Sequence, residues 1–147
     1  MNENYKKLGV TVTINAIIMF FLTYALIAEF GHLVPNINRF YMAIIMAAPM
    51  VVMMLVVMRS MYPNKRLNAI LISIFSIVFI GTLALARTQT PVGNEQFLRS
   101  MIPHHSSAIL MCEEGNITDP DISDLCVDIV EAQEREIAQM KEMLKRY

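Results

Sequence analysis

The sequence predicts an all-α membrane protein, in which three transmembrane helices precede an extracytoplasmic helical hairpin. Of its 147 residues, 55% are hydrophobic, and three long apolar segments lie within residues 1–87. Residues 88–147 are polar instead, and their apolar side chains recur at the spacing of amphipathic helices. A chain of this length has room for a membrane region and one small helical module, but not for a large enzyme domain.

The three apolar segments are Leu8–Phe30, Tyr41–Met58 and Ala69–Ala86. The first contains one charged residue, Glu29, near its end, and the other two contain none. Each approaches the ~20 residues that a helix needs to cross a bilayer, so we predict three spans. The alternatives are a signal peptide for the first segment and buried core helices for the others, but no small-residue cleavage site follows Phe30.

The charges are distributed unevenly along the chain. Residues 1–87 carry seven Lys and Arg against two acids, whereas residues 88–147 carry five against eleven. Five of the basic residues lie before the first span or between the second and third: Lys6, Lys7, Arg59, Lys65 and Arg66. The positive-inside rule then predicts a cytoplasmic-membrane protein whose C-terminal part is periplasmic or extracellular. Membrane lipid is an expected partner, and the lack of an extended basic patch argues against nucleic acid.

Residues 88–93 are predicted to form a linker, after which Asn94 is expected to cap a helix that runs to about Glu114. Pro103 lies inside that helix. It removes one backbone hydrogen bond and should kink the chain.

A second helix is predicted from Thr118 to about Arg146, which makes residues 94–147 an αα-hairpin. Its apolar positions form one continuous seam: Ile122, Cys126, Ile129, Gln133, Ile137, Met140 and Leu144. Two helices of this size bury little core, and pairing hairpins into a four-helix bundle would bury more. We therefore expect a homo-oligomer.

The hairpin contains the sequence Met-Ile-Pro-His-His at residues 101–105. On a helix its Met and His side chains share an arc of roughly 120° with later soft ligands. The predicted metal ligands are Met101, His104, His105, Met111 and Cys112, with Met140 on the second helix as either a ligand or a core residue. Thioether, imidazole and thiol groups together suit copper or zinc rather than magnesium or calcium.

Two polar residues interrupt or border the apolar seam. Gln133 and Glu136 would be costly to bury without hydrogen-bond partners, and hydrogen bonds to ligand histidines are one solution. Cys112 and Cys126 flank the turn closely enough for a disulfide, an alternative to metal binding by Cys112. Glu29 and His32 near the first span are either interfacial residues or a site through which metal enters.

A second methionine pattern lies in the second span. It consists of Met42, Met46, Met50, Met53, Met54 and Met58, within an arc of about 160°. Stacked thioethers could pass Cu(I) along a helix, and this one motif resembles the Met-x-x-x-Met of Ctr-type copper transporters. Methionine is also a flexible apolar filler between helices, so packing is the alternative interpretation.

Residues 94–147 resemble the family known as domain of unknown function 305. The pattern consists of Phe97, Met101 to His105, Ala108-Ile109, Met111, Gln133, Glu136-Ile137 and Met140. The resemblance implies a ferritin-like helical module outside the cytoplasm, and some relatives bind copper through Met and His. Many relatives carry two hairpins, so here a second subunit would have to complete the bundle. Cys112 stands where small residues are commoner.

These observations predict a membrane-anchored metal-binding protein for the sequestration, delivery or sensing of copper, as Cu(I), with zinc as the alternative metal. We do not expect an enzyme, because the resemblance implies no activity and the chain lacks the Glu-x-x-His pair of di-metal oxidases. Two other functions stay open. One is a copper transporter that uses the methionines of the second span, and the other is a structural module that only oligomerises.

Overall fold

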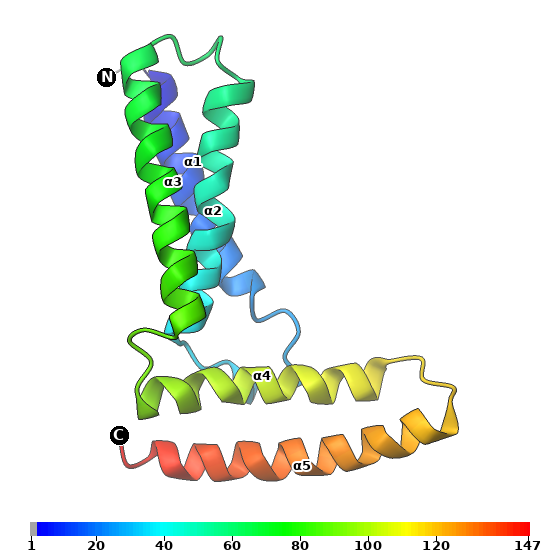
Figure 1. The fold of residues 1–147 in the computed structure, drawn as a ribbon. Helices are drawn as coiled ribbons and strands as arrows, with labels where there is room; N and C mark the ends of the chain where they lie inside the picture. Colours follow the sequence, from blue (N-terminus) through cyan, green and yellow to red (C-terminus); the bar gives the residue numbers. More distant parts are fainter. Residues whose placement is uncertain (1–2) are drawn as a thin grey trace. The chain divides into compact units, whose positions relative to one another are not determined.

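The computed structural model describes residues 3–147, and this part of the chain is helical with no β-strand. The elements are α1 (Glu3–Leu22), the short 3-10 helix η1 (Phe30–His32), α2 (Ile37–Val57), α3 (Lys65–Thr88), α4 (Asn94–Glu114) and α5 (Pro120–Leu144) (Figure 1). The predicted all-α class is confirmed. α1, α2 and α3 contain 20, 21 and 24 residues and are each long and apolar enough to span a membrane.

The chain divides into two compact units that do not follow the predicted domain boundaries. Among the described residues, one unit contains residues 3–23 and 38–91, and the other contains residues 24–37 and 92–147. The prediction of a first span over residues 8–30 is therefore wrong at its end, because α1 stops at Leu22. We call residues 24–36 the connector. Its apolar residues looked like a continuation of the span, but it belongs to the same unit as α4 and α5.

In the first unit, α1, α2 and α3 pack around a small apolar cluster. The buried members are Tyr5, Leu8, Val51, Leu55 and Tyr62, and residues of α3 such as Leu71 and Phe75 pack against them. The Tyr5 hydroxyl donates a hydrogen bond to Oδ1 of Asn68 at 2.7 Å, which joins the start of α1 to the start of α3. The side chain of Asn64 caps α3 by accepting from the Leu67 N–H at 3.0 Å.

The methionines of α2 lie mostly on the outside of this unit. Met42, Met46 and Met53 are exposed, whereas Met54 packs against the apolar cluster. For Met54, the interpretation as an apolar filler between helices is therefore the one that the structure supports.

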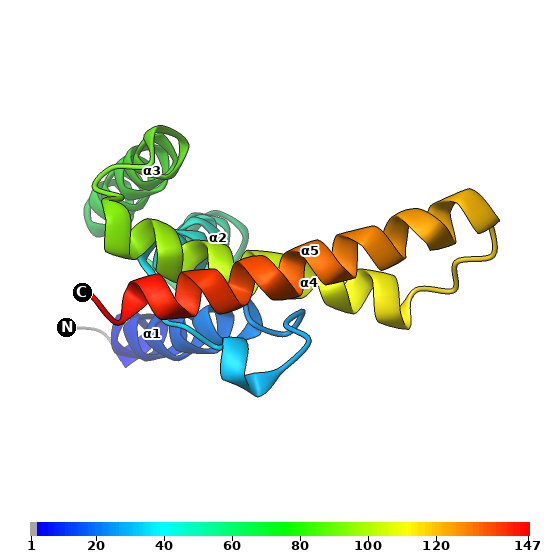
Figure 2. The same cartoon turned by 90° about the horizontal axis from the view of Figure 1, so that it is seen from below.

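In the second unit, α4 and α5 form an antiparallel hairpin (Figures 1 and 2). Its core contains Leu98, Ile102 and Ile109 from α4 and Ile137 and Met140 from α5. The seam predicted on the second helix is therefore used, at least in its C-terminal half, to pack against α4 of the same chain. A homo-oligomer would have to use other apolar side chains.

The hairpin ends differ from the predicted caps by one residue each. Gly93 rather than Asn94 is the N-cap of α4. Asp119 rather than Thr118 caps α5, and its Oδ1 accepts from the Asp121 and Ile122 N–H groups at 2.9 and 3.3 Å. Gly115 is the C-cap of α4, and a Cβ atom there would lie 2.5 Å from the carbonyl oxygen of Met111. Only glycine allows that close backbone approach.

The connector docks on α4 through hydrogen bonds, one of which depends on Pro103. Proline has no N–H, so the carbonyl oxygen of Arg99, four residues earlier, has no helical donor. The buried side chain of Asn36 fills this gap by donating from Nδ2 to the Arg99 oxygen at 3.3 Å. Further along, the Ala28 N–H donates to Oγ of Ser106 at 2.8 Å.

We predict that Asn36 and Pro103 are energetically coupled. Asn36→Ala should destabilise the full chain by about 1 kcal/mol or more, because the Arg99 carbonyl loses its donor. In a Pro103→Ala background the loss should be smaller, since residue 103 regains an N–H for that carbonyl. Thermal unfolding in detergent micelles measures both effects. Asn116→Ala, at an exposed turn residue, is the control, and equal losses in the two backgrounds would refute the coupling.

Candidate metal centre

The side chains of α4 point in three directions, which decide what each residue can do. One direction faces α5 and holds the apolar core of the hairpin. A second faces the connector, where Oε1 of Gln96 accepts from the Ile37 N–H at 3.0 Å and Ser106 is fully buried. The third direction is covered by neither α5 nor the connector, and Phe97, His104 and Met111 are exposed there. The arc of predicted ligands straddles the border between the first and third directions.

His105 lies on the side of α5, and both of its ring nitrogens are engaged. Nδ1 lies 3.0 Å from the carbonyl oxygen of Met101, and Nε2 lies 2.7 Å from Oε2 of Glu136. Both partners are acceptors, and each lies within hydrogen-bond distance of a ring nitrogen that a metal would need. In this structure His105 joins α4 to α5. It could ligate a metal through Nε2 only after Glu136, whose side chain is 50% exposed, turned away.

His104 is the neighbouring residue but points to the uncovered side. Its ring packs edge to face with that of His105, with 5.9 Å between the ring centroids. Within residues 3–147 no group forms a hydrogen bond with its ring nitrogens, so one nitrogen is available to a ligand. Met101 precedes it by three residues and is half-buried at the edge of the hairpin core. Side chains at this spacing are neighbours on a helix surface.

Met111 and Met140 lie in different surroundings, and neither lies beside Met101 and His104 on the uncovered side of α4. Met111 is 71% exposed and lies ten residues after Met101, which is roughly 15 Å along a helix. The two thioethers therefore cannot share one ion. Met140 is buried in the core between α4 and α5, in the same cluster as Met101. Of the two interpretations of Met140, core packing is the one that the structure realises.

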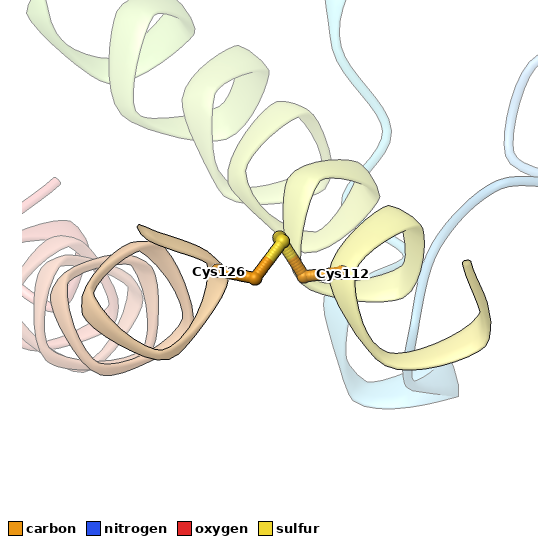
Figure 3. Close-up of a disulfide and its surroundings, with 2 residues drawn as sticks. All are labelled: Cys112 and Cys126. Atoms are coloured by element: carbon orange, nitrogen blue, oxygen red, sulfur yellow. A yellow bond between two sulfur atoms is a disulfide. The ribbon is translucent and has the colours of Figure 1, made fainter. Parts of the chain in front are cut away.

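The prediction of Cys112 as a metal ligand is wrong for this structure, because its sulfur is bonded to that of Cys126 (Figure 3). The Cα atoms of the two cysteines are 5.4 Å apart, and the bond joins α4 to α5 near the turn. The alternative of a disulfide is the one that forms. Closing a loop of this size stabilises a fold by about 3 kcal/mol, which matters for a two-helix core.

Gln133 and Glu136, the two polar residues predicted at the seam, have different surroundings in the structure. Glu136 has the expected role of a hydrogen-bond partner to a histidine, through His105. Gln133 is half-buried on α5, and its side chain makes no hydrogen bond within the described part of the chain. Among residues 3–147 no three His, Cys, Asp or Glu side chains converge as a metal site.

A buried polar cluster on the connector side joins His32 and Glu29, which the sequence analysis named, to Ser106, which it did not. His32 is 7% exposed, and its Nδ1 lies 2.9 Å from Oγ of Ser106, while its Nε2 lies 3.7 Å from Glu29. Burial lowers the pKa of His32 below its ordinary value of 6.5; Lys141 lowers it further, and Glu29 and Glu134 oppose the shift. The role of Ser106 was missed because it lies far from His32 in sequence. The cluster holds the connector on α4.

Comparison with known proteins places the chain in a family. The described residues form three helices that are long and apolar enough to span a membrane, followed by a disulfide-bridged helical hairpin. The family Domain of unknown function (DUF305) matches residues 82–144. An uncharacterized protein of Acanthamoeba polyphaga mimivirus is 36% identical over 111 residues, which are 74% of this chain and 71% of the viral protein. The chain belongs to the DUF305 family, as its Met-His pattern predicted.

The viral match also reaches beyond the hairpin. A region that covers 74% of the chain cannot be confined to α4 and α5, so it includes part of the apolar helices. No solved structure matches the chain.

We predict that acid weakens the second unit through His32. The lowered pKa means that the unfolded chain binds a proton on His32 more readily than the folded chain, so the free energy of unfolding falls as the pH drops below 6.5 toward the folded pKa. Well above 6.5 the histidine is neutral in both states and contributes no pH dependence. Melting temperatures of the full chain should fall with pH over this range, and less steeply for His32→Gln. Identical pH profiles would exclude His32 as the cause.

Proposed function

We propose that this protein is a membrane-anchored copper-binding protein that holds Cu(I) on the uncovered edge of α4, outside the cytoplasm. The observation that carries the proposal is the pair Met101 and His104, in which a thioether and an available imidazole nitrogen stand one helical turn apart. His105 and Glu136 support the pair from the side of α5, because their hydrogen bond fixes the face that α4 turns outward. Of the six predicted metal ligands, the proposal therefore keeps two, Met101 and His104.

The chemistry of the available donors favours copper over zinc. Structural and catalytic zinc sites use thiolate, imidazole and carboxylate ligands. Here the thiols are joined in a disulfide, and the described residues bring no three His, Cys, Asp or Glu side chains together. The remaining set combines a thioether with imidazole, and soft thioether ligands select Cu(I). A bound ion would take these side chains as ligands.

The exposure of His104 favours delivery over storage. An ion at the edge of a helix is accessible to another carrier, whereas a storage site would enclose it. Because Met42, Met46 and Met53 of α2 lie on the surface of the described chain, they do not favour transport by a single subunit. Apolar side chains that remain exposed on α5, among them Ile122, Leu125 and Val127, could support the predicted homo-oligomer.

The copper site is tested with single substitutions in the full-length protein. His104→Ala and Met101→Leu should each lower the Cu(I) affinity by about tenfold or more, which is roughly 1.4 kcal/mol. Leucine keeps the size of methionine and so preserves the packing of α4. Competition with a Cu(I) chelator measures the affinity, with ascorbate as the reductant so that the disulfide stays intact.

Met19→Leu, in α1, is the matched control for loss of one thioether and should leave the affinity unchanged. Wild-type affinity in both His104→Ala and Met101→Leu would rule out this site. Loss of copper binding in Met19→Leu would instead point to a site among the apolar helices.

The proposed orientation rests on the basic residues that flank the apolar helices. Lys6 and Lys7 near the start of α1 and Lys65 and Arg66 at the start of α3 should be cytoplasmic, which puts the hairpin outside. A protease added to spheroplasts should then remove a tag placed after Tyr147. A tag that only lysed cells expose to the protease would reverse the orientation.

A further inference from the structure

The connector between α1 and α2 has its polar side chains inside and its apolar side chains outside. Its buried polar residues are His32 and Asn36, both 7% exposed. The exposed side chains include Leu26 and Leu33, and Phe30 is 93% exposed, more than any other large apolar residue of the described chain. A loop in water shows the opposite arrangement, so these apolar side chains indicate a surface that something covers.

The polar side chains cannot simply be exchanged for the apolar ones. Asn36 donates to the Arg99 carbonyl oxygen, and His32 and the Ala28 N–H both contact Ser106. These hydrogen bonds fix which side of the connector faces α4. Leu26, Phe30 and Leu33 are therefore held outward.

The position of the connector in the chain identifies what covers it. It joins the end of α1 to the start of α2, both of which are apolar enough to cross a membrane. Phe30 is eight residues after Leu22 and seven before Ile37, so the chain keeps it within roughly 30 Å of both helix ends. Phe and Leu side chains at such a place are suited to the interfacial region of the bilayer.

We propose that the connector is a membrane-interface anchor, which inserts Leu26, Phe30 and Leu33 into the outer leaflet of the bilayer. The inference rests on the membrane anchoring of the proposed function. The ligand is the acyl-chain boundary of the lipid rather than its charge, because Glu29 is the only Asp, Glu, Lys or Arg of the connector. Zwitterionic and anionic vesicles should therefore serve equally well.

The chain contains no tryptophan, so a single Trp reports its own surroundings without background. Phe30→Trp in the full-length protein, reconstituted in phosphatidylcholine vesicles, should emit at short wavelength. Phosphatidylcholine brominated near the headgroup end of its acyl chains should quench most of this emission. Leu125→Trp is the matched control, because Leu125 is 55% exposed on α5, and bromine should leave its emission unchanged.

Each other outcome decides against the anchor. If the Phe30→Trp protein emits at the wavelength of a tryptophan in water, without quenching, the connector stays in solvent. Short-wavelength emission without quenching would mean that protein, such as a second copy of the chain, covers it. Flotation of the wild-type protein with the vesicles is scored separately, and its failure would overturn the membrane anchoring of the proposed function itself.

Discussion

Because Pro103 has no N–H, the carbonyl oxygen of Arg99 cannot be satisfied within α4, and the organisation of the second unit depends on how this gap is filled. Asn36 reaches it from the connector, 63 residues earlier in the chain. A proline inside a helix usually weakens it. Here the lost hydrogen bond becomes a docking point for a segment that was predicted to continue the first span but belongs to the hairpin unit.

This docking determines which part of α4 remains for chemistry. α5 covers one side through the apolar core and the His105–Glu136 contact, and the connector covers another through Ser106. Only the third side is open, and it carries His104. The disulfide between the helices adds a covalent constraint near the turn, at the opposite end of α4 from its start. The packing of α5 and of the connector on the two neighbouring sides thus determines which edge of α4 is exposed.

Much of the hairpin could be predicted because its information is local. Helical spacing and turn residues placed α4 within residues 94–114 and α5 within two residues of its observed ends. The first span was predicted too long because hydropathy cannot detect that Ala28 hydrogen-bonds to Ser106, 78 residues later. The fate of Cys112 was open for the same reason, since only the register of the two helices brings it to Cys126.

The site was the least predictable part, because adjacent residues of one motif separate in space. Successive side chains on a helix point about 100° apart, so five residues sample every face. Met101 supplies a thioether at the edge, and its carbonyl oxygen contacts the ring of His105. Ile102 enters the core and Pro103 releases the carbonyl that binds the connector. His104 is left exposed because each neighbouring direction is already in use. A motif that looked like one set of ligands therefore also holds α5 and the connector, and this is why any metal site on it must be small.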